Sequence, residues 1–115
     1  MTELKIHVGE GFAALKARTL DAVARAKAGQ AVQENHLSFV SWEALIGVMT
    51  PKRLDLLRAV HQQPQPSVAA LSRALQRDYK RVHEDVRALV AAGLMEQDSD
   101  GLRAGYDRIE TAITL

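Results

Sequence analysis

The order of helix start and stop signals in the second half of the chain constrains the fold more than any other feature. The pattern predicts helices over residues 51–62, 67–75 and 78–92. Each begins beside a residue that can cap the free N–H groups of the first turn, namely Thr50, Ser67 and Asp78. Pro51 favours the first helical position, and Gly93 can adopt the left-handed conformation that ends a helix. The last two helices are therefore expected to be joined by a tight turn.

A β-hairpin is expected directly after the third of these helices. Residues 94–97 and 102–104 are its predicted strands, and the intervening Asp98-Ser99-Asp100-Gly101 has the composition of a turn. A helix-turn-helix followed by a hairpin is the arrangement of a winged helix-turn-helix domain, whose second helix enters the major groove of DNA. The sequence therefore predicts such a DNA-binding domain over residues 36–105.

The helix over residues 78–92 has one apolar and one charged side. With about 100° between successive residues, its apolar side consists of Val82, Val86, Leu89 and Val90. The other side and the preceding turn carry the main candidates for DNA contact, which are Arg77, Lys80, Arg81, His83, Glu84 and Arg87. Arg and Lys can reach guanine acceptors or phosphates, and Glu can accept from a cytosine amino group. The alternative is a solvated helix face with i,i+4 pairs such as Lys80–Glu84.

Supporting contacts to DNA are expected from the two preceding helices and from the hairpin. The candidates are Ser67, Ser72, Arg73, Lys52, Arg53 and Arg103. Ser67 is equally a plain helix cap, and Asp98 and Asp100 near Arg103 would repel phosphate, so a weak contribution is expected from the hairpin.

Residues 51–93 carry eight basic and four acidic side chains, an excess that fits phosphate binding and equally fits ordinary surface variation.

The two ends of the chain require partners of their own. Residues 3–8 alternate between polar and apolar, as in a half-buried strand, and residues 106–115 alternate in the same way. Because a lone strand cannot satisfy its backbone groups, these two segments are expected to pair, either within one chain or between two. Residues 10–28 predict an amphipathic helix that has an apolar stripe to bury and ends at Gly29.

The segment between this helix and the DNA-binding region is less regular. Residues 30–37 are expected to form a linker or a weak edge strand, and residues 37–40 an extended stretch. Ser41 is then the expected cap of a helix that begins at Trp42.

The predicted fold is mainly α with a small β component, or α+β. It consists of a winged helix-turn-helix with an N-terminal strand–helix extension and a C-terminal strand. The predicted division is a dimerisation or partner-binding extension over residues 1–35, the DNA-binding domain over residues 36–105, and a C-terminal strand over residues 106–115. DNA-binding modules of this kind usually bind paired half-sites as two-fold dimers, which favours a homodimer built by the terminal segments over a monomer.

Several stretches resemble known regulators. Leu71-Ser72-Arg73-Ala74-Leu75 and Gly93-Leu94 look like the MarR-like winged-helix regulators. The start Thr50-Pro51-Lys52-Arg53-Leu54, the stretch Val82-His83-Glu84-Asp85-Val86 and the terminal Tyr106-Asp107 resemble a family of small DNA-binding proteins described as antitoxins of toxin–antitoxin pairs. The resemblance covers most of residues 36–115. It implies a dimeric DNA-binding repressor that could also hold a toxin protein.

Neither the composition nor the motifs point to an enzyme, a cofactor or a metal site. Cysteine is absent, which excludes disulfides, cysteine-based zinc sites and thiol catalysis. The histidines lack metal-binding spacing, and there is no glycine-rich phosphate loop. No apolar run approaches the length of a membrane span, and the first residues do not form a signal peptide, so a cytoplasmic protein is expected.

The leading interpretation is a sequence-specific regulator of transcription that binds double-stranded DNA as a dimeric repressor. The family resemblance adds autoregulation as an antitoxin to this interpretation. The alternative is a protein-interaction module with a winged-helix fold that neutralises a partner without binding DNA. Changing Lys80, Arg81 and Arg87 to alanine would distinguish the two, because only the first interpretation needs these cations.

Overall fold

The computed structural model describes residues 2–27 and 35–115. Helices and strands both contribute, so the coarse prediction of a mixed α and β protein is confirmed. The elements are β1 (Glu3–Val8), α1 (Phe12–Lys27), β2 (Asn35–Phe39), α2 (Trp42–Val48), α3 (Pro51–Gln62), α4 (Val68–Leu75), α5 (Tyr79–Ala91), β3 (Glu96–Asp98), β4 (Gly101–Arg103) and β5 (Arg108–Ile113). The predicted helix end at Gly29 lies outside the described residues.

The chain forms two compact units. The first comprises the residues up to Leu45 together with Arg108–Leu115, and the second comprises Ile46–Asp107. Helix α2 crosses the boundary, and Ser41 caps it as predicted, because its hydroxyl accepts a hydrogen bond from the Ala44 amide at 3.1 Å. Residues 36–45, which the sequence analysis assigned to the DNA-binding region, lie in the first unit.

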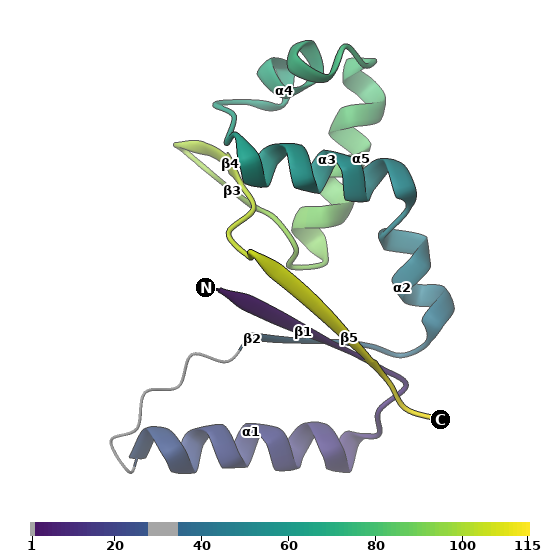
Figure 1. Cartoon of the computed structure of the whole chain (residues 1–115), viewed down its shortest axis with the longest axis vertical. Helices are drawn as coiled ribbons and strands as arrows, with labels where there is room; N and C mark the ends of the chain where they lie inside the picture. Colours follow the sequence, from purple (N-terminus) through teal and green to yellow (C-terminus); the bar gives the residue numbers. More distant parts are fainter. Residues whose placement is uncertain (1, 28–34) are drawn as a thin grey trace. The chain divides into compact units, whose positions relative to one another are not determined.

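The first unit is built on a three-stranded sheet with β1 between β2 and β5 (Figure 1). Both pairings are parallel, and Ile6 lies opposite Leu37 on one side and Thr111 on the other. The predicted pairing of residues 3–8 with the C-terminal segment is confirmed, and it occurs within one chain. The parallel direction was not predicted. It requires a crossover between β1 and β2, and α1 lies within that connection.

The two faces of β1 differ in polarity, as its alternation predicted. Leu4, Ile6 and Val8 are buried. On the other face, a polar cluster made by His7, Glu10, Arg18, His36 and Ser38 ties α1 to the sheet.

Within the polar cluster, the rings of His7 and His36 share a hydrogen bond of 2.8 Å between Nε2 and Nδ1. Glu10 accepts hydrogen bonds of 2.7 Å from Arg18 and of 2.7 Å from Ser38. The Arg18 hydrogen bond lowers the pKa of Glu10 to about 2, so this carboxylate stays charged well into the acidic range.

Acidification is expected to destabilise the first unit through His7. Burial, together with the nearby positive charge of Arg18, holds the pKa of His7 below its usual value of 6.5. The unfolded chain therefore binds this proton more readily than the folded chain. Neutral His7 therefore contributes fully to the free energy of unfolding above pH 6.5. This contribution is lost as the pH falls from 6.5 through the lowered pKa of the folded state.

Urea unfolding of the wild type and of a His7→Gln variant, between about pH 7.5 and about pH 5.5, measures this effect. The wild type should lose stability with a slope of at most about 1.4 kcal/mol per pH unit, and the variant should show a shallower slope. Equal slopes for the two proteins would rule His7 out as the cause.

In the second unit, the three helices predicted from the sequence are confirmed to within one residue at each end. Their capping residues are also confirmed. The side chains of Thr50, Ser67 and Asp78 accept hydrogen bonds from the backbone amides three residues later at 3.3, 3.0 and 3.2 Å. Helix α5 packs against α3 and α4, and its buried residues are Val82, Val86 and Leu89.

The turn between α4 and α5 depends on a residue that the sequence did not single out. Gln76 adopts a left-handed conformation with φ of 53°, although it is not a glycine. The backbone amide of Arg77 then donates to the carbonyl of Ser72 at 3.0 Å, which closes the turn. At the other end of α5, Gly93 has a φ of 83°, as its predicted role requires.

The hairpin after α5 forms as predicted, but both of its strands are shifted and the first is one residue shorter. The first strand begins at Glu96 instead of residue 94, because the backbone amide of Leu94 donates to the Leu89 carbonyl at 2.9 Å and so belongs to the end of α5. Gly101 is already part of the second strand. Leu102 exchanges two backbone hydrogen bonds with Gln65, of 2.8 and 3.3 Å, and these attach the hairpin to the connection between α3 and α4.

Candidate functional site

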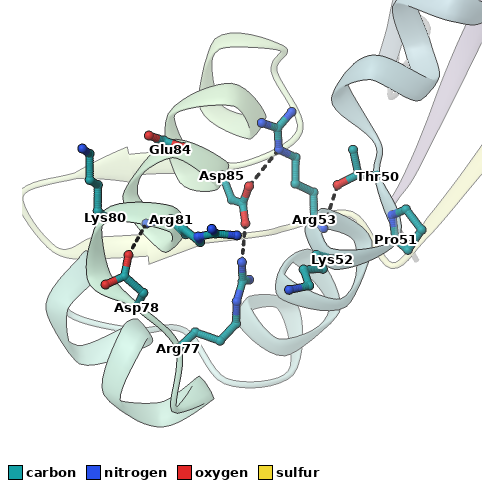
Figure 2. Close-up of a pocket in the computed structure, with 10 residues that line it drawn as sticks. All are labelled: Thr50, Pro51, Lys52, Arg53, Arg77, Asp78, Lys80, Arg81, Glu84 and Asp85. Atoms are coloured by element: carbon teal, nitrogen blue, oxygen red, sulfur yellow. Dashed lines mark hydrogen bonds and ion pairs between the residues drawn. The ribbon is translucent and has the colours of Figure 1, made fainter.

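An open groove of about 670 Å³ lies between the beginning of α3 and the beginning of α5, within the second unit (Figure 2). Residues from both helix starts line it, namely Thr50, Pro51, Lys52, Arg53, Arg77, Asp78, Lys80, Arg81, Glu84 and Asp85. The groove therefore brings together two helix N-termini and five basic side chains. Its lining suits a negatively charged ligand better than an apolar one.

Asp85 organises one side of the groove. Its Oδ1 accepts a hydrogen bond of 3.0 Å from Arg53 Nε, and its Oδ2 accepts one of 2.8 Å from Arg77 Nη2. Arg53 also donates to the carbonyls of Gly47 and Val48 at 3.1 and 3.3 Å. Figure 2 shows the two guanidinium groups approaching Asp85 from opposite sides. We refer to Arg53, Asp85 and Arg77 as the arginine clamp.

The clamp joins segments that are distant in sequence. The side chain of Asp85 is only 15% exposed, and burial alone would raise its pKa, but the hydrogen bonds from Arg77 and Arg53 more than offset this and lower it. The carboxylate is therefore charged at neutral pH and fixes the start of α5 relative to α3. Sequence reasoning missed this role. The available signal was an acidic residue beside the buried stripe of α5, since such a position requires a partner.

Replacing Asp85 with asparagine is expected to destabilise the protein by about 1–2 kcal/mol, because two partly buried arginines lose their shared counter-charge. Thermal or urea unfolding measures the loss. Asp55→Asn is the matched control, because Asp55 is 78% exposed and its ion pair with Arg58 is long, at 3.7 Å. The control should stay within about 0.5 kcal/mol of the wild type. Equal effects of the two substitutions would show that the clamp adds no stability.

Lys52, Lys80 and Arg81 are the groove cations outside the clamp. All are exposed, and within residues 2–27 and 35–115 none of these side chains forms an ion pair. The i,i+4 pair between Lys80 and Glu84 is likewise not formed in the described part of the chain. These charges are therefore available to a ligand, whereas those of Arg53 and Arg77 are largely compensated by Asp85.

The structure places the remaining predicted contact residues outside the groove. Ser67 caps α4, and Ser72 is buried and donates to the Ala69 carbonyl at 2.9 Å. Arg103 is held on the hairpin by Glu96 and Asp98 at 2.9 and 2.7 Å. The other three, Arg73, His83 and Arg87, lie on α4 and α5, and Arg73 and Arg87 are exposed.

Other kinds of site find little support in the described residues. No group of three or more His, Asp or Glu side chains in that part of the chain is arranged to hold a metal ion. Among the described helices, none is both long and apolar enough to cross a membrane.

Comparison with known proteins gives one result. The HVO_A0114 family model matches residues 48–111, from the end of α2 to within β5. Neither the curated proteins nor the solved structures contain a match to the chain. The matched segment includes the whole groove and exceeds half of the 115 residues. The chain therefore belongs to the HVO_A0114 family.

Proposed function

We propose that the protein is a regulator of transcription that binds double-stranded DNA through a winged helix-turn-helix made by α3, α4, α5 and the β3–β4 hairpin. Helix α5 is the recognition helix in this proposal. The observation that carries it is the pair Lys80 and Arg81 in the first turn of α5. Both side chains are exposed beside an open basic groove, and neither forms an ion pair within the described part of the chain. Such a helix start is suited to base edges in the major groove and to the flanking phosphates.

The neighbouring elements support the same assignment. A tight turn at Gln76 separates α4 from α5, and a hairpin follows α5 almost directly, as in winged helix-turn-helix domains. The clamp holds α3 and α5 at a defined separation, so Lys52 from α3 faces the same groove as Lys80 and Arg81. Arg103 is engaged by two carboxylates on the hairpin, which agrees with a weak contribution from the wing.

The biological role follows from the resemblance described for the sequence. In this proposal the protein acts as a dimeric repressor, and autoregulation as an antitoxin is the specific form that the resemblance implies. Two copies would present two recognition helices to half-sites about one helical turn apart.

Fluorescence anisotropy tests the proposal directly. The full chain is titrated against a duplex from upstream of its own gene and against a scrambled duplex of equal composition, each at two salt concentrations. We expect tighter binding to the upstream duplex and a loss of affinity with added salt, because phosphate contacts release counterions. Absence of binding to both duplexes at low salt would overturn the proposal and favour a protein-interaction module.

A further inference from the structure

Three basic side chains of the groove point toward one another, although they come from different segments. Lys52 lies on α3, Arg77 in the turn before α5, and Arg81 on α5, and all three line the groove. Figure 2 shows their charged ends directed toward the same part of it, whereas Lys80 points away from them. We refer to Lys52, Arg77 and Arg81 as the converging cations. Because like charges repel, an anion between them would stabilise this arrangement.

The carboxylates of the groove do not offset this charge in full. The lining has five basic and three acidic side chains. Asp85 is shared between two arginines, and Asp78 already caps α5 through a hydrogen bond of 3.2 Å from the Arg81 amide. The third carboxylate, Glu84, lies on the same side of the picture as Lys80 in Figure 2. The region between the converging cations therefore has an excess of positive charge.

The two arginines of the clamp differ in the donors that they leave free. Arg53 donates to Asp85 through Nε and to two backbone carbonyls through Nη1. Among the residues that the structure describes, the side chain of Arg77 donates to Asp85 through Nη2 alone. A guanidinium has several N–H groups in a fixed planar fork, so Arg77 still presents Nε and Nη1 to a ligand. Asp85 therefore holds Arg77 in place without using all of its donors.

We propose that the converging cations bind a single phosphate group of the DNA backbone, and that Asp85 is the positioning residue for Arg77. This inference rests on the proposed function for the source of the phosphate, because a free phosphate monoester offers the same chemistry. Phosphate oxygens accept charge-assisted hydrogen bonds from several directions, which suits donors from three segments better than one base edge does. Lys80 and Glu84 point elsewhere and remain for the bases.

This division predicts different effects on specificity. Phosphate contacts fix the position of a protein on the duplex but are the same in every sequence. Lys52→Ala should therefore weaken binding to the upstream and the scrambled duplex by the same factor, about tenfold, and reduce the salt slope by about one. Lys80→Ala should weaken binding to the upstream duplex more than binding to the scrambled one. A loss of preference in Lys52→Ala equal to that in Lys80→Ala would contradict the assignment of Lys52 to a phosphate.

Single neutral linkages in the upstream duplex identify the contacted phosphate. Each backbone phosphate is replaced in turn by an uncharged methylphosphonate. At one position in each half-site, the wild type should lose affinity by at least about tenfold, whereas Lys52→Ala should lose less than about threefold because its contact is already absent. Lys5→Ala, which removes a positive charge from the first unit, is the matched control and should lose as much as the wild type. Equal losses in Lys52→Ala and the wild type at every position would overturn the proposal.

The same scan separates positioning by Asp85 from its effect on stability. Asp85→Asn is measured at a temperature at which thermal unfolding shows the variant to be folded. If Asp85 positions Arg77, this variant should lose less than about threefold at the sensitive linkage. Arg77→Lys should behave in the same way, because a lysine keeps the charge but lacks the planar fork that reaches Asp85 and a phosphate together. Losses as large as those of the wild type in both variants would limit Asp85 to stabilising the fold.

Inorganic phosphate tests the same site without DNA. The full chain is titrated at constant ionic strength, and the NMR signals of the arginine Nε–H groups are followed. The signals of Arg77 and Arg81 should shift and saturate, and Lys52→Ala should raise the dissociation constant by at least about threefold. Arg87, which is exposed on α5 outside the groove, is the internal control and should shift little. Equal shifts without saturation at all three arginines would refute the phosphate site.

The two measurements also distinguish failure of this inference from failure of the proposed function. A wild type that binds inorganic phosphate at Arg77 and Arg81 but binds neither duplex would refute DNA binding and assign the site to a free phosphate monoester. A wild type that binds the upstream duplex without any linkage sensitive to Lys52 would leave the DNA function intact and overturn the phosphate site.

Discussion

Replacing both Lys80 and Arg81 with alanine is expected to weaken binding to the specific duplex by at least about 100-fold. A well-placed contact from Lys or Arg to a base edge or phosphate contributes about 1–3 kcal/mol, and a 100-fold loss corresponds to about 1.4 kcal/mol from each of the two contacts, which lies within that range. The fold should be unaffected, because both side chains are exposed and alanine favours helices. Fluorescence anisotropy measures the affinity, and thermal unfolding verifies stability.

The control for this variant removes the same amount of charge elsewhere. Lys5→Ala combined with Arg108→Ala takes two positive charges from the first unit, outside the groove. If DNA binding depended only on net charge, both double variants would weaken it equally. Wild-type affinity in the Lys80, Arg81 variant would contradict the assignment of α5 as the recognition helix.

The second large effect is expected at Gly101, where alanine should destabilise the second unit by about 2–4 kcal/mol. The φ of Gly101 is 122°, a region that side chains strongly disfavour. A Cβ at this position would overlap the carbonyl oxygen of Gln65 and lie 2.8 Å from the Cα of Pro66. Relief would require the hairpin to move away from Gln65 and would break its hydrogen bonds with Leu102.

Gly105→Ala is the matched control, because a Cβ there would meet nothing within 4 Å. Urea unfolding of both variants measures the difference, and the control should remain within about 0.5 kcal/mol of the wild type. Similar stabilities for the two variants would show that the backbone contact at Gly101 relaxes without cost.

The sequence predicted the helices of the second unit well because their signals are local. A capping hydroxyl or carboxylate acts on amides two or three residues away, and the apolar spacing of α5 is set by the helix itself. Ser41, Ser67 and Asp78 therefore cap helices as expected. Leu94 was misplaced in the hairpin, because its backbone amide donates to the Leu89 carbonyl and closes the end of α5 instead.

The candidate site was predictable only in part. The helical spacing of Lys80 and Arg81 indicated an exposed basic helix start, and the structure places both beside the groove. The same reasoning treated Arg53 and Arg77 as free cations. Asp85 forms hydrogen bonds with both arginines, although Arg53 is 32 residues and Arg77 is 8 residues away in the sequence. No sequence pattern specifies those two contacts.

The sequence by itself determined where most helices and strands begin and end, because capping, turn chemistry and apolar periodicity act over a few residues. Only the tertiary structure decided the parallel sheet, the arginine clamp and the polar cluster that joins α1 to the sheet. Each of these depends on side chains or backbone groups that meet across long stretches of chain. The energy of each such contact depends on how deeply the group is buried and on which partner it meets. Both are defined only after the chain has folded.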